Sequence, residues 1–216
     1  SLIIAMVTIP LMADTVMGKT PLTGALWLLR MTGVIPVGAV VGGLLLGRAG
    51  VRPVTVAGLG LAALGLFLAG TWGLDVAEPE LSWHLAAAGL GFGLVISPIM
   101  TRALNTVTED YRATAASLVV VARMMGMTLG LAALSAWGVE HFQVLTAGLE
   151  FPLPEPGETA GALQARLSEY NAGLAAAGLS LFQNFLRVAG GVALVAILPA
   201  LAMRAGRRQP EAIARE

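Results

Sequence analysis

The chain has 216 residues, of which 56% are hydrophobic and only 12% are charged, and its mean hydropathy is +0.80. A soluble domain carries roughly 25% charged residues, so this composition excludes an ordinary soluble domain with a wet surface. The formal net charge is zero, which argues against nucleic acid as a partner. There is no cysteine, which excludes disulfides and cysteine-based metal or nucleophile chemistry.

Six apolar runs approach the ~20 residues that a helix needs to cross a membrane, and the first of them is short. The connection at 140–175 is long, and its segment FPLPEPGE contains three prolines, which are incompatible with helix. After it, residues 159–174 are suited to an amphipathic helix at the surface. The sequence therefore predicts an all-α membrane protein with a basic tail at 204–216. The predicted spans are 2–17, 22–46, 54–74, 84–104, 113–139 and 176–203.

Basic residues orient the predicted bundle. If the connections at 47–53 and 105–112 and the tail face the cytoplasm, the opposite side carries only Lys19 and Arg166. This bias predicts a multi-pass protein of the cytoplasmic membrane with its C-terminus in the cytoplasm. The eight cytoplasmic arginines would be Arg48, Arg52, Arg102, Arg112, Arg204, Arg207, Arg208 and Arg215. The four tryptophans fall near the outer ends of spans and are interpreted as interfacial anchors: Trp27, Trp72, Trp83 and Trp137.

Small residues recur at intervals of four in two spans. Gly38 and Gly42 share one face of the second span, and Gly126 and Gly130 share one face of the fifth. Because small residues let transmembrane helices approach closely, these glycines are interpreted as helix-packing positions. A functional alternative is that glycine- and proline-rich helices bend and slide, as alternating access requires. The glycines at 89–93 lack the third glycine of a dinucleotide fingerprint, so nucleotide binding is rejected.

Three arginines, Arg30, Arg123 and Arg187, lie deep inside predicted spans. Counted from the nearer span end, each is roughly 15 Å deep, close to the membrane midplane. A charge at that depth costs at least ~2.5–3.5 kcal/mol, so each arginine needs a partner. The nearby acid is Asp14, for which an interfacial position is favoured over proton relay. The predicted bundle therefore cannot neutralise its arginines alone, and an acidic partner or a polar ligand from outside it is expected.

The surroundings of two arginines leave alternatives open. Gln183 and Asn184 lie four and three residues before Arg187, so the three share a helix face. Such a polar stripe faces either a cavity, which is favoured, or a neighbouring helix. Arg123 is flanked by methionines, whose flexible side chains suit either packing or substrate contact. His84 and His141 are interpreted as interfacial rather than as a metal pair. Because no nucleophile–base or metal-ligand spacing is evident, neither an enzyme nor a cofactor is expected.

A resemblance to a known family rests on three segments. The loop containing Gly43, Arg48, Gly50 and Arg52 resembles the cytoplasmic loop G-x-x-x-[DR]-x-x-G-[RK]-[RK] of the major facilitator superfamily, although an aspartate is missing. The segments AGLGFGLVISP at 88–98 and AASLVVVARMMGMTLGLAALSAWG at 115–138 resemble the 14-span drug:proton antiporter branch. Within that branch, the chain is most similar to mycobacterial-type lipid-exporting permeases, from IPLMADTV to about residue 149.

The resemblance implies that the six spans are the C-terminal bundle of a major facilitator fold, and that an N-terminal half supplies acidic partners. It implies a proton-coupled exporter of lipidic, amphipathic or drug-like substrates that works by alternating access, with a periplasmic lipoprotein as a further partner. The alternative is a non-transporting scaffold subunit or half-transporter relic. The loop residues named above would gate the cytoplasmic side. The substrate or coupling candidates are Arg30, Arg123, Arg187, Gln183, Asn184 and Asp14.

Overall fold

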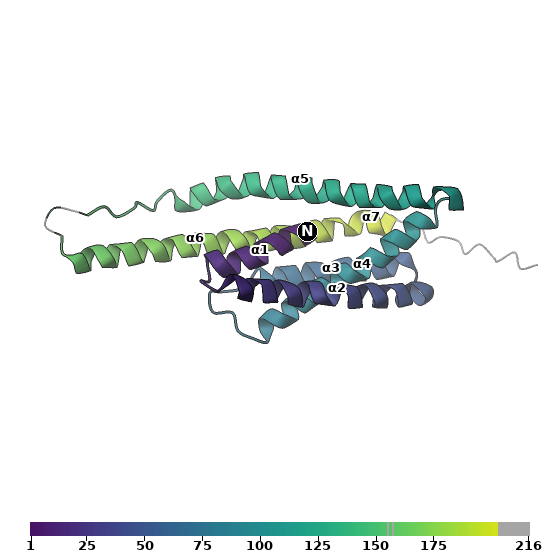
Figure 1. The fold of residues 1–216 in the computed structure, drawn as a ribbon, viewed down its shortest axis with the longest axis horizontal. Coiled ribbons are helices and arrows are strands. Elements are labelled where there is room, and N and C mark those ends of the chain that lie inside the picture. Colours follow the sequence, from purple (N-terminus) through teal and green to yellow (C-terminus); the bar gives the residue numbers. More distant parts are fainter. Residues whose placement is uncertain (155, 157, 203–216) are drawn as a thin grey trace, which may run out of the picture.

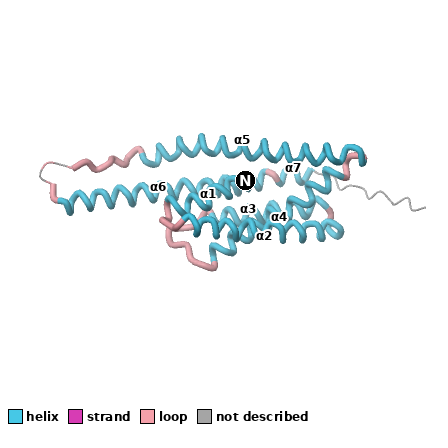
Figure 2. Tube along the Cα trace, in the orientation of Figure 1, coloured by secondary structure: helices cyan, strands magenta, loops and turns pink. Residues whose placement is uncertain are grey.

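The computed structural model describes residues 1–154, 156 and 158–202. Helices account for all regular structure in these residues (Figures 1 and 2), in agreement with the predicted all-α class. Five helices are long and apolar enough to cross a membrane, and a sixth apolar helix, α1, has 14 residues. The predicted tail and Met203 lie outside the described residues. The elements are α1 (Leu2–Thr15), α2 (Pro21–Ala49), α3 (Val51–Ala69), α4 (Glu80–Leu104), η1 (Glu109–Tyr111), α5 (Arg112–Thr146), α6 (Ala160–Val195) and α7 (Ile197–Ala202).

Local sequence signals set the helix boundaries. Thr20 caps the start of α2, where its hydroxyl accepts a hydrogen bond from the backbone N–H of Thr23, and Pro21 is the first residue of the helix. The Thr159 hydroxyl caps α6 in the same way. Between α2 and α3, Gly50 adopts φ +84°, a conformation that favours glycine, so the chain reverses within one residue. The turn at Gly50 and the α4–α5 connection lie at the same end of the bundle (Figure 1), which we name the inner end. The opposite end, with the α3–α4 and α5–α6 connections, is the outer end.

The helix α4 lies between α2 and α3, and alternating glycines make this possible. A Cβ atom at Gly89 would lie 2.0 Å from the carbonyl oxygen of Met31 in α2, and one at Gly93 would lie 2.2 Å from that of Ile35. On the other side of α4, a Cβ atom at Gly91 would lie 2.3 Å from the backbone nitrogen of Ala62 in α3. The backbones of the three helices therefore touch, and only glycine fits at these contacts.

The glycines of α2 and α5 differ in their surroundings. Gly38 and Gly42 contact the backbone of α4 at Leu90 and Leu94, whereas a Cβ atom at Gly126 or Gly130 would meet no atom within 4 Å. In its most apolar stretch, α5 has only 6% of its residues buried, compared with 50% in α4. Most of the surface of α5 is therefore open along this stretch.

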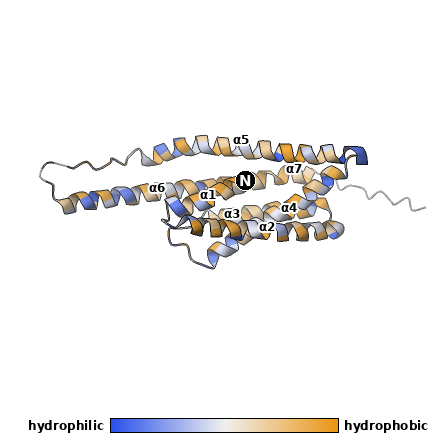
Figure 3. Cartoon of the chain, viewed as in Figure 1, coloured by the Kyte–Doolittle hydropathy of each residue, from blue (hydrophilic) through white to orange (hydrophobic). Residues whose placement is uncertain are grey.

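The helices α5 and α6 are longer than the predicted spans. They contain 35 and 36 residues, roughly 53 Å at 1.5 Å per residue, and they continue past the other helices at the outer end (Figure 1). The segment 159–174 is not a separate surface helix, because it runs without a break into the rest of α6. No proline interrupts residues 160–195, and alanine-rich sequence favours a continuous helix. Hydrophilic residues gather on this outer part of α6 (Figure 3).

Replacement of Gly91 by alanine tests the backbone contact between α4 and α3. We expect Gly91→Ala to lower the free energy of unfolding by at least about 1–3 kcal/mol, because the methyl group overlaps Ala62. The thermal midpoint of the full-length protein in detergent measures this loss. Gly60→Ala on α3 is the matched control, since nothing lies within 4 Å of its Cβ position. Equal midpoints for the two variants would contradict the packing described here.

Candidate functional site: charged and aromatic side chains at the outer end

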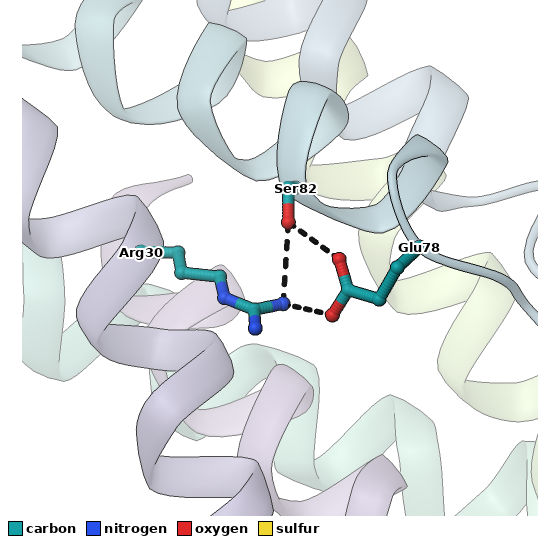
Figure 4. Close-up of polar contacts among 3 residues, drawn as sticks. All are labelled: Arg30, Glu78 and Ser82. Carbon is teal, nitrogen blue, oxygen red and sulfur yellow. Dashed lines mark hydrogen bonds and ion pairs between the residues drawn. The ribbon is translucent and has the colours of Figure 1, made fainter.

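Arg30 of α2 has an acidic partner within this chain. Its guanidinium group contacts the Glu78 carboxylate and donates to the Ser82 hydroxyl at 3.2 Å (Figure 4). The Ser82 hydroxyl in turn donates to the other Glu78 oxygen at 2.6 Å. The expectation that only Asp14 lies near Arg30 was therefore wrong. Its cause is the start of α4, which begins at Glu80 instead of residue 84, so that Glu78 and Ser82 lie level with Arg30 of α2.

The environment of Glu78 favours its charged form. Glu78 lies in the α3–α4 connection, outside the membrane-spanning helices. The hydrogen bond from Ser82, followed by the hydrogen bond from Arg30, lowers the pKa of Glu78 below its usual value of 4.5. The carboxylate therefore stays ionised at neutral pH and neutralises Arg30.

Arg187 also lies nearer to the outer end than its place in the sequence suggested. Its Cγ atom would lie 2.9 Å from a Cβ atom at Gly70, the residue that ends α3. The helix α6 continues past the end of α3, so residue 176 does not mark the level at which α3 ends, and counting from it placed Arg187 too deep. The side chain is exposed and forms no salt bridge with a described residue.

The polar neighbours of Arg187 point to other helices. The Gln183 amide donates to the carbonyl oxygen of Trp72 at 2.7 Å. The Asn184 amide nitrogen lies 3.3 Å from Nε2 of His141, and because this amide nitrogen is a donor, the ring nitrogen accepts. Both side chains thus bond to other parts of the bundle, as in the second of the two alternatives above, in which the polar stripe faces a neighbouring helix. They join α6 to the end of α3 and to α5.

Aromatic rings continue these contacts across the bundle. Trp72 is 1% exposed, and its indole N–H donates to Nδ1 of His84 at 3.0 Å. Trp27 packs edge-on against Trp72 with ring centroids 6.4 Å apart. On α5, Trp137 stacks on His141 at 4.9 Å. We name these five residues the aromatic layer. It lies at the outer ends of α3 and α4 and reaches α2, α5 and, through Gln183 and Asn184, α6.

Two of the four tryptophans therefore do not act as interfacial anchors. Trp27 and Trp72 are buried in the core, whereas Trp83 is 72% exposed and Trp137 is 37% exposed. The prediction failed because position near a span end fixes the depth of a side chain but not the face of the helix on which it lies. The sequence did contain an indication of this burial. Trp72 lies near the end of one predicted span and His84 begins the next, so the two side chains can meet.

Arg123 and Asp14 are exposed, and neither forms an ion pair with a described residue. Arg123 lies on α5, 11 residues or roughly 17 Å from its start, beside the exposed side chains of Met124 and Met125. Within the described residues, Arg123 forms no hydrogen bond or ion pair with Arg30 or Asp14. Arg123 thus remains a charge within a predicted span that has no acidic partner in the described part of the chain.

The predicted gating loop occupies the inner end. Arg48 closes α2, Arg52 opens α3, and both side chains are exposed. Gly43 lies deeper in α2, where a Cβ atom would be 3.3 Å from the Ser97 hydroxyl oxygen of α4. Within the described residues, no group of three histidine, aspartate or glutamate side chains is arranged to hold a metal ion.

Comparison with known proteins finds similar transporters. No family model matches the chain. The chain is 39% identical over 172 residues, 74% of its length, to a triacylglyceride transporter of Mycolicibacterium hassiacum. It is 37% identical over 183 residues, 78% of its length, to a probable triacylglyceride transporter of Mycobacterium bovis and to a triacylglyceride transporter of Mycobacterium tuberculosis. The chain spans about one third of the length of these relatives, 32% and 35%. Their names agree with the predicted resemblance to mycobacterial lipid exporters.

The pKa of Glu78 makes a small part of the stability depend on pH. A depressed pKa means that stabilisation is complete above the unfolded-state pKa and is lost as pH falls through the folded-state value. We expect Glu78→Gln to lower the free energy of unfolding by at most about 1 kcal/mol at pH 7, because the pair is half exposed. Thermal midpoints at pH 7 and below pH 4.5 measure the effect. The difference from wild type should shrink at the lower pH, and a difference that grows there would contradict this assignment.

The buried position of Trp72 predicts a large effect of its removal. We expect Trp72→Ala to cost about 3–5 kcal/mol of unfolding free energy, since it leaves a cavity and an unpaired His84 nitrogen. Trp83→Ala is the matched control, because this ring is exposed and the substitution should cost far less. Thermal midpoints of the two full-length variants compare them. A larger loss for Trp83→Ala would restore the interfacial interpretation of Trp72.

Proposed function

We propose that this chain is the C-terminal six-helix half of a major facilitator transporter that exports a lipid by alternating access. The observation that carries the proposal is the 39% identity to a triacylglyceride transporter over 74% of the chain. Five helices able to cross a membrane support the same conclusion. The substrate class proposed is therefore a neutral or amphipathic lipid, and proton coupling is the proposed energy source.

The open surface of α5 is the proposed contact with the other half. Only 6% of its most apolar stretch is buried, and large apolar side chains such as Leu118, Met125 and Leu129 are exposed along it. Arg123 is exposed on the same helix and has no acidic partner in the described chain. Because an unpaired charge is not tolerated within a membrane, we propose that an acidic side chain of the other half faces Arg123. The substrate cavity would lie between these surfaces.

The two ends of the bundle would have different roles. At the inner end, the exposed Arg48 and Arg52 are proposed to contact the other half when the cavity is closed to the cytoplasm. At the outer end, α5 and α6 continue past the other helices and offer a surface for the periplasmic lipoprotein that the resemblance implies. In this orientation the C-terminus is cytoplasmic.

Substitution of Arg123 tests the proposal. In proteoliposomes with an imposed proton gradient, we expect Arg123→Ala in the full-length protein to reduce transfer of a fluorescent triacylglyceride at least ~10-fold, equivalent to ~1.4 kcal/mol of activation free energy. Arg123→Lys should recover part of the activity, because it keeps the charge. Arg112→Ala, at the exposed start of α5, is the control and should transport normally.

Three results would count against the proposal. Normal transport by Arg123→Ala at equal expression would remove Arg123 from the mechanism. Transport that does not respond to the proton gradient would remove the coupling. A wild-type protein that is folded and inserted but transfers no lipid would favour a scaffold subunit instead.

A further inference from the structure

A cavity of about 480 Å³ opens between α1, α5 and α6 on the outer side of the aromatic layer. Phe182 and Phe142 line it. Phe182 contacts Phe185, which contacts Trp137 of the aromatic layer, and Phe142 directly follows His141 in α5. This volume lies within the ~300–1,000 Å³ range of small-molecule sites. Phe142 lies 19 residues after Arg123, roughly 28 Å along α5, so the cavity is distinct from the proposed central cavity.

The sequence of α6 creates the cavity. The lining residues of α6 lie on one face of the helix, because each is three or four residues from another of the set: Asn171, Leu174, Ala175, Gly178 and Phe182. The two small residues in the middle of this face leave the space that the larger residues surround. The helix α1 ends at Thr15, and the next residue, Val16, closes one wall, where a Cβ atom at Gly178 would lie 2.9 Å from it.

The lining selects the chemistry of a ligand. Among the described residues, no charged side chain lines the cavity, so an ionised head group would find no charged partner there. Two lining residues are polar, Thr15 and Asn171. The Thr15 hydroxyl already donates to the carbonyl oxygen of Leu11 at 2.7 Å, whereas the Asn171 amide forms no hydrogen bond with a described residue. The cavity therefore suits a long apolar group that carries an uncharged hydrogen-bond acceptor.

We propose that this cavity binds one fatty acyl chain of an ester lipid, and that the Asn171 amide donates to its ester carbonyl. The proposal deepens the lipid-transport function and rests on it for the relevance of acyl esters. The acyl ester has two possible sources, a triacylglyceride in transit and a phospholipid of the membrane. Because α5 and α6 extend beyond the cavity at the outer end, a chain bound here occupies the base of that extension.

Photocrosslinking in the full-length protein tests the site. The probe is a triacylglyceride with a diazirine in one acyl chain, and the crosslinked peptides are identified by mass spectrometry. We expect labels on residues that line the cavity, such as Phe142 and Leu174. Ala175→Trp fills the cavity and should reduce labelling there at least ~10-fold. Ala176→Trp is the matched control, because its neighbouring, exposed position does not line the cavity and should leave labelling unchanged.

A second variant isolates the role of Asn171. Asn171→Leu should weaken labelling by the ester probe about 2- to 10-fold, the usual effect of one hydrogen bond, and should not weaken labelling by a diazirine-bearing alkane of equal length. Competition identifies the source of the chain: an excess of unlabelled triacylglyceride or of phosphatidylglycerol displaces the probe, and either result supports the acyl site. Equal losses with both probes would remove Asn171 from the proposal.

Other outcomes overturn the site without touching transport. Equal labelling of Ala175→Trp and Ala176→Trp, or the absence of labels from the cavity, would mean that the cavity holds no acyl chain. The alternative occupant is then a segment of the full-length protein. Lipid transfer is measured on the same preparations. Labelling of the cavity in a protein that does not transport lipid would keep the site and reject the proposed function, whereas transport without labelling would do the reverse.

Discussion

The contact on which the rest of the bundle depends is the passage of α4 between α2 and α3. Lipid tails are as apolar as the helix surfaces, so helices in a membrane gain little from burying hydrophobic area and associate through close packing. Gly89 and Gly93 admit the backbone of α2 on one side of α4, and Gly91 admits that of α3 on the other. Any side chain at these positions would push the three helices apart. The aromatic layer lies at the outer ends of these helices, so its rings would then lose contact with one another.

The charges inside the predicted spans are balanced in different ways. Arg30 is neutralised locally, because Glu78, two residues before the start of α4, lies level with it. Arg187 lies level with the end of α3, where a long side chain can reach water or lipid head groups. Arg123 differs from both, since it is exposed on α5 without an acidic partner in the described chain. The imbalance inferred from three arginines is thus reduced to one position in a predicted span, Arg123, that has neither an acidic partner among the described residues nor a place level with a helix end.

The sequence was sufficient for the helical class and for the apolar stretches, because both follow from composition and length. It was not sufficient for the depth of Arg30 and Arg187, which depends on how far neighbouring helices are shifted along one another. That shift is set by contacts such as Gly70 against Arg187, which residue spacing within one helix does not encode. The burial of Trp72 was not predicted for a related reason, since its partners Trp27 and His84 come from other segments. The cavity was missed because it needs α6 to begin at Ala160 and α1 to end at Thr15.

Two kinds of contact divide the bundle. Backbone contacts at the glycines of α4 resist sliding, because a shift of one residue would bring a Cβ atom where only glycine fits. In contrast, α5 meets α6 through side chains, with the Phe185 ring over Gly138 and the bond between His141 and Asn184. Side-chain contacts can be remade after a small rotation or translation, whereas these backbone contacts cannot. If a transporter exposes its cavity alternately to the two sides, α5 is the helix of this chain best suited to move. Because both sites lie on this one helix, its motion would change two places at once. These are the surroundings of Arg123 and the wall of the acyl cavity at Phe142.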